Sequence, residues 1–389
     1  MFDFKTVPHL IFETGAAAKL ADYASPRMKR PMLTTDKGVV DAGLIDPTLE
    51  SLKAAGMEVL FYDQVEADPP ARTIKEAVAA ARDHGADGVI GFGGGSSLDT
   101  AKLIAVLAPA GAQALEDVYG ADQVRGDRLR LILTPTTAGT GSEVTSISVV
   151  TSDDDQKIGV VSDQLYADLA IVDASLTLTA PRHVTAATGI DAMVHAIEAY
   201  TSKIKKNPIS DALAKEALKL LSANIARACD HPGDVKAREA MALGATLAGQ
   251  AFANAPVAAV HAMAYPLGAL FHVPHGLSNA LMLAPVLKFN APVAAAQYAE
   301  LADAIGVSAP FSNTVSATVS TEAKAAAFVD EITALCRATG VDQTLESVGV
   351  SHNALPKMAE DVMKIDRLLK NNPRQMTYDD ALRLYTEVL

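Results

Sequence analysis

Residues 89–102 read Val89-Ile90-Gly91-Phe92-Gly93-Gly94-Gly95-Ser96-Ser97-Leu98-Asp99-Thr100-Ala101-Lys102. The run places a glycine turn between an apolar strand and a helix. Glycine lets the backbone approach a ligand closely, and the N–H groups at a helix start are available to a phosphate. Ser96 replaces the last glycine of the G-x-G-x-x-G fingerprint. The run therefore indicates a phosphate cradle or a tight strand–helix turn, with Ser96 or Ser97 as helix cap and Asp99 in the first turn.

The residues on both sides of this run repeat the same alternation. Over the first 180 residues, short apolar segments alternate with alanine-rich helical segments. This pattern is typical of a parallel sheet covered by helices, so we expect residues 1–180 to form an α/β domain with a Rossmann-like sheet. The expected strands are Pro31–Thr35, Glu58–Tyr62, Gly88–Gly91, Leu129–Thr134 and Leu169–Val172, and the expected helices include Thr73–His84 and Asp99–Ala108.

After Pro181 the strand signals fade and helical patterns follow one another. A chain of 389 residues exceeds one ordinary core, which fits two domains. We expect residues 181–389 to form an all-helical domain, interrupted by a Ser-, Thr- and Ala-rich loop at Val307–Thr321. The expected helices are Asp211–Arg227, Val235–Gln250, Val257–Leu270, Ala294–Ile305, Ala323–Thr339 and Asp379–Val388.

Charge and composition narrow the choice of partners and compartment. The formal net charge of -13 and the pI near 5.1 disfavour nucleic acid and anionic membranes as partners. Met1–Lys5 lacks the basic start and the apolar run of a signal peptide, so we expect a cytoplasmic protein. Cys229 and Cys336 show no metal-ligand spacing and are expected to be buried thiols. We also expect a homodimer or a higher homo-oligomer.

A second unusual loop follows the next expected strand. Leu131–Thr145 runs from apolar residues into Thr134-Pro135-Thr136-Thr137-Ala138-Gly139-Thr140-Gly141-Ser142. Such a loop can present hydroxyl and backbone donors to a polar ligand, although a solvated turn explains it equally well. Two such loops in one parallel α/β domain favour a shared ligand at the carboxyl ends of the strands.

Four residues in the second half have the chemistry of a metal site. Asp191 and His195 lie four apart beside an apolar helical stripe, so they share one helix face. Such a pair alone is more often a simple hydrogen bond. His261 stands in nearly uncharged surroundings, where a histidine needs a partner, and His275 follows downstream. One carboxylate and three imidazoles suit a divalent ion such as Fe²⁺ or Zn²⁺.

The motifs together resemble a known family. Gly93–Lys102, Thr134–Thr145, Gly189–Tyr200 and Val260–Ala280 are similar to the hallmark segments of the iron-containing (group III) alcohol dehydrogenases, in matching order and at matching separations. The similarity extends over nearly the whole chain, including Asn371-Asn372-Pro373-Arg374. It implies an N-terminal α/β domain like that of dehydroquinate synthase, a helical C-terminal domain, and a cofactor in the cleft between them. It also implies that Asp191, His195, His261 and His275 hold the metal, Fe²⁺ first and Zn²⁺ second.

The resemblance further implies which residues contact the cofactor. The pyrophosphate is expected against the glycine turn and the helix start at residues 94–99. The nicotinamide half is expected along the hydroxyl-rich loop, and Lys157 is also expected to contact the cofactor. The residues concerned are Gly94, Gly95, Ser96 and Asp99 for the pyrophosphate, and Thr136, Thr137, Thr140, Ser142 and Thr145 for the nicotinamide half.

Asp36 predicts the choice between NAD and NADP. It directly follows the strand Pro31–Thr35, where a parallel α/β domain approaches an adenosine ribose. A carboxylate there accepts hydrogen bonds from ribose hydroxyls and repels a 2′-phosphate. The resemblance points the same way, so we expect NAD; the alternative is a turn-forming aspartate before Lys37-Gly38.

One departure from the family concerns the proton relay. Many members carry a histidine where this chain has Tyr265, four residues after His261. Tyr265 is expected either to exchange a proton through its hydroxyl or to line the cleft, and His272 either replaces the relay or forms part of the wall. We treat both as candidate catalytic residues.

These features predict a metal-dependent enzyme that transfers a hydride between NAD and a small alcohol or its aldehyde or ketone. The alternatives are a hydroxyacid–oxoacid transhydrogenase, a reductase like maleylacetate reductase, and a metal-dependent lyase or hydrolase on the same scaffold. A non-catalytic assembly protein has no need of all four ligands. The sequence names neither the alcohol nor the physiological direction of the reaction.

Overall fold

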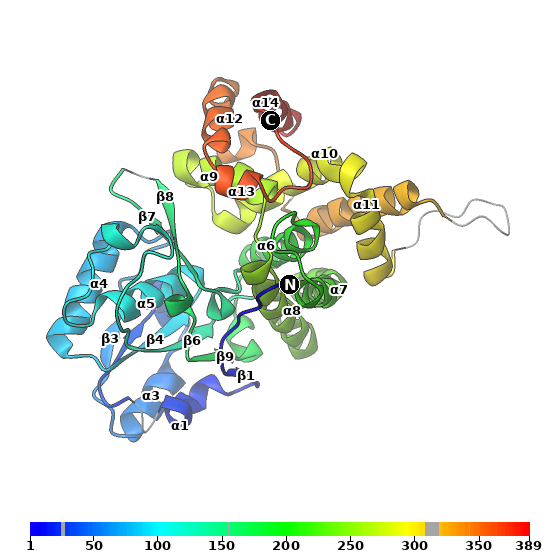
Figure 1. Ribbon diagram of the computed structural model, residues 1–389. Helices are drawn as coiled ribbons and strands as arrows, with labels where there is room; N and C mark the ends of the chain where they lie inside the picture. The colour runs from blue at the N-terminus through cyan, green and yellow to red at the C-terminus, as the bar shows by residue number, and fades with distance from the viewer. Residues whose placement is uncertain (25–27, 155, 308–318, 342) are drawn as a thin grey trace. The chain divides into compact units, whose positions relative to one another are not determined.

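The chain folds as two units that divide after Ala180 in a computed structural model (Figure 1). The structure describes residues 1–24, 28–154, 156–307, 319–341 and 343–389. Lys5–Ala180 form the N-terminal unit, and Pro181–Leu389 form the C-terminal unit together with Met1–Phe4.

A six-stranded parallel sheet organises the N-terminal unit, as expected. Its strand order is β1-β9-β6-β4-β2-β3, and each neighbouring pair is parallel. All residues of β2, β4 and β9 are buried, which explains why their sequences are continuously apolar rather than alternating. The strands are β1 (Leu10–Phe12), β2 (Pro31–Thr34), β3 (Leu60–Tyr62), β4 (Gly88–Gly93), β6 (Arg130–Pro135) and β9 (Leu169–Val172).

Helices cover both faces of this sheet. Successive strand residues point to opposite faces, so Val89 joins one apolar cluster and Ile90 the other. The Val89 face packs against α4 (Ala71–His84) and α5 (Gly95–Leu107). The opposite face packs against α1 (Leu20–Ala24), α2 (Lys37–Asp41) and α3 (Asp46–Ala54). This arrangement brings the carboxyl ends of β2, β4 and β6 to one edge of the sheet.

Two details of the N-terminal unit differ from the sequence prediction. A second sheet, β5-β8-β7, was not expected; it contains β5 (Gly120–Ala121), β7 (Ile147–Thr151) and β8 (Lys157–Val161). The prediction of a serine cap on α5 was wrong. The N-cap is Gly94 without a side-chain hydrogen bond, and the helix starts at Gly95, so Asp99 lies beyond the first turn. The glycine backbone already turns the chain, which leaves the two serines inside the helix.

Helices alone build the described part of the C-terminal unit. The helix predicted at Ala294–Ile305 was too short, because the observed helix begins at His275. Pro285 and Pro292 lie inside this helix, although proline usually ends a helix. The predicted loop Val307–Thr321 falls mostly outside the described residues. The helices are α6 (Arg182–Thr201), α7 (Pro208–Asp230), α8 (Val235–Asn254), α9 (Ala259–Phe271), α10 (His275–Ala304), α11 (Thr321–Thr339), α12 (Leu355–Met363), α13 (Asp366–Leu369) and α14 (Tyr378–Glu387).

The described helices carry no candidate membrane span, because none combines sufficient length with sufficient apolar character. Cys229 and Cys336 are both buried, as the composition predicts.

Candidate metal centre

Helix α6 supplies the first two side chains of the centre. Asp191 and His195 are one turn apart on this helix and are almost fully buried, at 1% and 4% exposure. Most of α6 is buried on all sides, which explains why its sequence shows apolar residues around both polar ones. A buried carboxylate and a buried imidazole require partners, and the other two helices of the site supply them.

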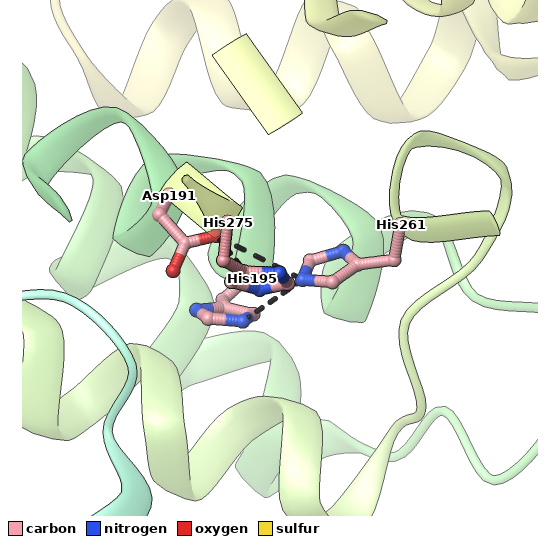
Figure 2. Close-up of side chains that lie close together, drawn as sticks. All are labelled: Asp191, His195, His261 and His275. Atoms are coloured by element: carbon pink, nitrogen blue, oxygen red, sulfur yellow. Dashed lines mark hydrogen bonds and ion pairs between the residues drawn. The ribbon is translucent and has the colours of Figure 1, made fainter. Parts of the chain in front are cut away.

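Helices α9 and α10 bring the remaining two histidines. His261 lies in the first turn of α9, and His275 is the first residue of α10. His261 is 3% exposed, whereas the side chain of His275 is 41% exposed. Figure 2 shows the four side chains converging. The centre is thus deeply buried on the α6 side and open beside His275.

The donor atoms of these residues fit one metal ion. One ligand atom from each of Asp191, His195, His261 and His275 lies within 4.8 Å of all the others. The Nε2 atoms of His195 and His261 are 3.0 Å apart. Asp191 Oδ1 lies 3.9 Å from His261 Nε2 and 3.6 Å from His275 Nε2. Two donors at about 2.1 Å from one ion are separated by about 3.0 to 4.2 Å, depending on the angle. The three separations fall in that range.

Neighbouring groups keep the carboxylate of Asp191 ionised. Burial alone raises the pKa of a carboxylic acid, but the three histidines and a hydrogen bond from Asn279 together hold the pKa of Asp191 below its ordinary value. Asn279 Nδ2 donates to Asp191 Oδ1 at 2.6 Å and lies 3.2 Å from His275 Nε2. Asn279 was not predicted, although it follows His275 by four residues on the same helix.

Aromatic stacking fixes the ring of His195. Phe252 of α8 stacks on it with the ring centroids 4.3 Å apart and an interplanar angle of 18°. The ring of His261 lies 4.7 Å from that of His195. Phe252 therefore packs directly against the ring of one candidate ligand, His195.

The two candidate relay residues occupy different settings. Tyr265 lies one turn after His261 on α9, and Arg367 of α13 donates from Nη2 to its hydroxyl at 3.1 Å. His272 is the exposed C-cap of α9 and has a φ of 53°, a left-handed conformation that is uncommon outside glycine. Tyr265 therefore shares a helix with the candidate ligand His261, while His272 ends that helix.

Three predicted cofactor segments meet at one edge of the N-terminal sheet. Asp36 follows β2, and its Oδ2 accepts from Ser97 Oγ of α5 at 3.2 Å. Gly93 has a φ of 152° and no room for a side chain, because a Cβ there approaches Ser97 within 2.6 Å. Thr136 N donates to Gly93 O at 2.9 Å, which joins the loop after β6 to the glycine turn. The three segments therefore lie together at this edge, while the ligand that they are expected to share stays a prediction.

Other predicted cofactor residues are engaged within the N-terminal unit. Asp99 accepts from Ser142 Oγ at 2.6 Å and from Val149 N at 2.9 Å. The fully buried Lys102 donates to Ser142 Oγ at 2.7 Å, to Thr145 Oγ1 at 3.1 Å and to Ile147 O at 2.6 Å. Lys102 was not singled out by the sequence, and it fastens the hydroxyl-rich loop to α5.

Six further predicted residues lie around the same loops. Lys157 forms an ion pair with Asp68 at 2.5 Å. Ser96 Oγ accepts from Asp68 N at 3.2 Å. A Cβ on Gly95 has a contact of 2.8 Å with the methyl group of Thr140, so the glycine turn and the second loop touch. Thr137 lies beside Gly94, with 3.8 Å between its methyl group and a Cβ placed on that glycine. Cofactor contacts by these residues stay predictions.

Two family matches together cover most of the chain. Residues 8–174 match the family "Iron-containing alcohol dehydrogenase", and residues 185–389 match "Fe-containing alcohol dehydrogenase family, C-terminal". The chain belongs to the iron-containing alcohol dehydrogenase family.

Named relatives agree with this membership. The chain is 40% identical over 359 residues to long-chain-alcohol dehydrogenase 1 of Geobacillus thermodenitrificans (strain NG80-2), which covers 92% of this chain and 89% of the relative. It is 35% identical over 381 residues to sulfoacetaldehyde reductase of Bilophila wadsworthia (strain 3_1_6), covering 97% of each. A crystal structure of 1,3-propanediol oxidoreductase superposes with a TM-score of 0.93 at 33% identity, covering 100% of both chains.

The protein is therefore a metal-dependent alcohol dehydrogenase that uses NAD and an iron ion. A sulfoacetaldehyde reductase from Bifidobacterium kashiwanohense, solved in complex with NAD⁺, has the same fold, with a TM-score of 0.88 at 27% identity and coverage of 100% of this chain and 98% of that one.

Proposed function

We propose that Asp191, His195, His261 and His275 hold one ferrous ion, and that the enzyme interconverts a primary alcohol and its aldehyde with NAD(H). The observation that carries the proposal is the convergence of four donor atoms within 4.8 Å, three of them on buried residues. A divalent ion bound there supplies a Lewis acid for the oxygen of the substrate. Nitrogen and oxygen donors of this kind suit Fe²⁺ and also Zn²⁺.

The protein side chains around the centre have separable tasks. Asn279 and Phe252 orient two of the ligands, Asp191 and His195. The exposed side of His275 leaves the centre open to a substrate there. Tyr265, one turn from His261, is proposed to exchange the proton of the alcohol through its hydroxyl. Hydride transfer is the chemistry of the nicotinamide, and the protein contributes position and electrostatic field.

The names of several relatives support an aldehyde rather than a ketone. They include a sulfoacetaldehyde reductase, a lactaldehyde reductase of Escherichia coli (strain K12) and a 1,3-propanediol dehydrogenase of Klebsiella pneumoniae, at 35%, 33% and 36% identity. These substrates differ in polarity and charge, so we propose the shared aldehyde and primary alcohol chemistry and no single compound.

A substrate panel tests this proposal. The protein, reconstituted anaerobically with Fe²⁺, is assayed by NADH absorbance with primary alcohols, secondary alcohols, diols, aldehydes, ketones and oxo acids. We expect turnover of aldehydes and primary alcohols that disappears on chelation and returns with added Fe²⁺. Turnover confined to ketones or oxo acids contradicts the substrate class, and full turnover after complete metal removal contradicts the ion.

The N-terminal unit is proposed to bind NAD at the carboxyl edge of its sheet. The support is the meeting of Asp36, the glycine turn after β4 and the loop after β6. Ligands of open parallel sheets bind at this edge. Assembly into a homodimer or a higher homo-oligomer is also a proposal, which light scattering on the purified protein tests directly.

A further inference from the structure

Glu198 is a buried carboxylate that the sequence did not single out. It lies on α6, three residues after His195 and seven after Asp191, and is 4% exposed. A buried carboxylate is costly unless hydrogen-bond donors surround it. Glu198 and the residues that it contacts all lie in the C-terminal unit.

Three donors from one other segment meet this carboxylate. Val260 N donates to Oε1 at 2.7 Å. Ala258 N donates to Oε2 at 2.9 Å, and His261 Nδ1 lies 2.7 Å from the same oxygen. Ala258 is the N-cap of α9 and makes no side-chain cap of its own. Glu198 therefore caps the start of α9 from a neighbouring helix and contacts a metal-ligand ring at the same time.

The contact with His261 determines the tautomer of the ring. A carboxylate only accepts hydrogen bonds, so Nδ1 of His261 must carry a hydrogen. In a neutral imidazole the other nitrogen, Nε2, then has the lone pair. Nε2 is the atom that lies 3.0 Å from Nε2 of His195 and 3.9 Å from Asp191 Oδ1, inside the candidate centre.

We propose that Glu198 is a positioning residue, which holds His261 in the tautomer that directs a lone pair into the metal centre. The inference rests on the proposed metal site, and it concerns a residue outside the four ligands. Helix α6 then carries two ligands and the group that orients a third. A carboxylate behind a ligating histidine both fixes the ring and raises its basicity.

Glutamine at position 198 tests the proposal because it keeps the shape of the side chain. All three partners of Glu198 are donors, and the amide replaces one accepting oxygen with an NH₂ donor. In either orientation of the amide one backbone N–H faces the NH₂ group, and when the NH₂ group takes the Oε2 position the ring of His261 faces it as well. The imidazole is the partner that can adapt, because it can move its hydrogen from Nδ1 to Nε2, whereas a backbone N–H cannot.

Metal titration of the whole protein gives the first readout. We expect Glu198→Gln to bind Fe²⁺ or Zn²⁺ about 10- to 100-fold more weakly than wild type. Glu300→Gln is the control, since it makes the same chemical change at a carboxylate of α10 that accepts a hydrogen bond from the hydroxyl of Tyr200 at the end of α6. Affinity within about twofold of wild type in both variants overturns the proposal. Absence of stoichiometric metal binding by the wild type overturns the metal site itself, and so separates the two failures.

Nitrogen-15 spectra of metal-free wild type give a second readout that needs no variant at residue 198. With ¹⁵N-histidine, and with His261 assigned by its loss in His261→Asn, we expect the Nδ1–H form of the neutral ring. A predominant Nε2–H form overturns the proposal. In Glu198→Gln we expect an appreciable Nε2–H population, which a purely structural cap of α9 does not produce. This measurement remains decisive if the variant fails to fold.

Discussion

Arg367 donates a hydrogen bond from Nη2 to the hydroxyl oxygen of Tyr265, at 3.1 Å. The guanidinium carbon also lies 5.8 Å from the centre of the tyrosine ring. Because guanidinium groups only donate, the hydrogen of the phenol is not used in this contact and remains available to another acceptor. Tyr265 is one turn from His261 on α9.

Replacing Tyr265 with phenylalanine separates a proton relay from a cleft wall. If the hydroxyl exchanges protons with the substrate, Tyr265→Phe lowers kcat by about 10- to 1000-fold and changes its pH dependence. Rate profiles across pH on the Fe²⁺-loaded enzyme measure this, with Tyr23→Phe in α1 as the control. Unchanged profiles together with altered KM values across the alcohol panel assign Tyr265 to the wall.

Removing one ligand is expected to remove metal and activity together. His261→Ala deletes one of four donors, so both metal content and turnover fall to near background. His352→Ala, an exposed histidine in a short 3₁₀ helix, is the control and retains both. Metal analysis and NADH assays on the same preparations check this. One ion per chain with near-normal turnover in His261→Ala is incompatible with the ligand assignment.

Strand β9 and helix α10 show where the sequence predicts the bounds of an element and where it does not. Strand β9 falls at Leu169–Val172, as predicted, because buried parallel strands are short, continuous apolar runs. Helix α10 was predicted nineteen residues too short at its N-terminal end, since Pro285 suggests a break. Tertiary packing overrides that local preference: Val286, Leu287 and Phe289 after this proline are buried, so the helix continues.

Some residues of the site can be predicted from their neighbours in the sequence, whereas others depend on contacts between residues far apart in the chain. Asp191 and His195 are recognisable because four-residue spacing on a helix is local. The role of Glu198 depends on the start of α9, about sixty residues later, returning to α6. Lys102 was read as part of an apolar helix, and only the packed structure shows its three oxygen acceptors. Contacts that close over long sequence separations have no local signal.

Asp36 is expected to exclude NADP by its charge. A 2′-phosphate near the carboxylate costs about 1 to 4 kcal/mol, depending on the effective dielectric constant. Asp36→Asn keeps the cap of α2, where Asp36 accepts from Val39 N, but removes the charge. We expect kcat/KM for NADP relative to NAD to rise by about 5-fold or more, and further in Asp36→Gly. Steady-state kinetics with both cofactors decide this; a wild type that uses NADP as well as NAD shows that Asp36 is not the selector.

The pair Arg128–Asp168 predicts a pH-dependent contribution to stability. Arg128 donates to both oxygens of Asp168 at 2.7 and 3.0 Å, and Leu131 N donates at 2.8 Å. Burial raises the pKa of Asp168, but these bonds outweigh it, so the pKa lies below the ordinary 3.8. The unfolded chain then takes up a proton first on acidification. The stabilisation is complete well above pH 3.8 and is lost as the pH falls through the lower folded value.

Asp168→Asn checks this in urea unfolding. At pH 7 we expect a loss of about 1.5 to 3 kcal/mol, typical of a hydrogen bond to a charged group. The difference from wild type shrinks as the pH falls below the ordinary aspartate value. Asp163→Asn, which breaks an exposed pair with Lys5, is the control and changes stability by about 1 kcal/mol at most. An Asp168→Asn difference that is the same at every pH refutes the assignment.

Gly276 is expected to control the metal centre without being a ligand. It follows His275, and a Cβ placed on it lies 2.6 Å from Ala187 O and 2.8 Å from Ala187 C, both backbone atoms of α6. A backbone cannot swing aside as a flexible side chain can, so Gly276→Ala must push the start of α10 away from α6. His275 moves with α10 because it is the first residue of that helix, whereas Asp191 lies on α6, one turn after Ala187. The distance between His275 Nε2 and Asp191 Oδ1, which is 3.6 Å, therefore changes. Overpacking of this kind costs about 1 to 3 kcal/mol, and we expect metal affinity to fall by about 5- to 150-fold.

Gly233→Ala is the matched control, since nothing lies within 4 Å of its Cβ position. Metal titration of the two folded variants gives the comparison, and equal affinities show that the α6–α10 contact does not set the position of His275.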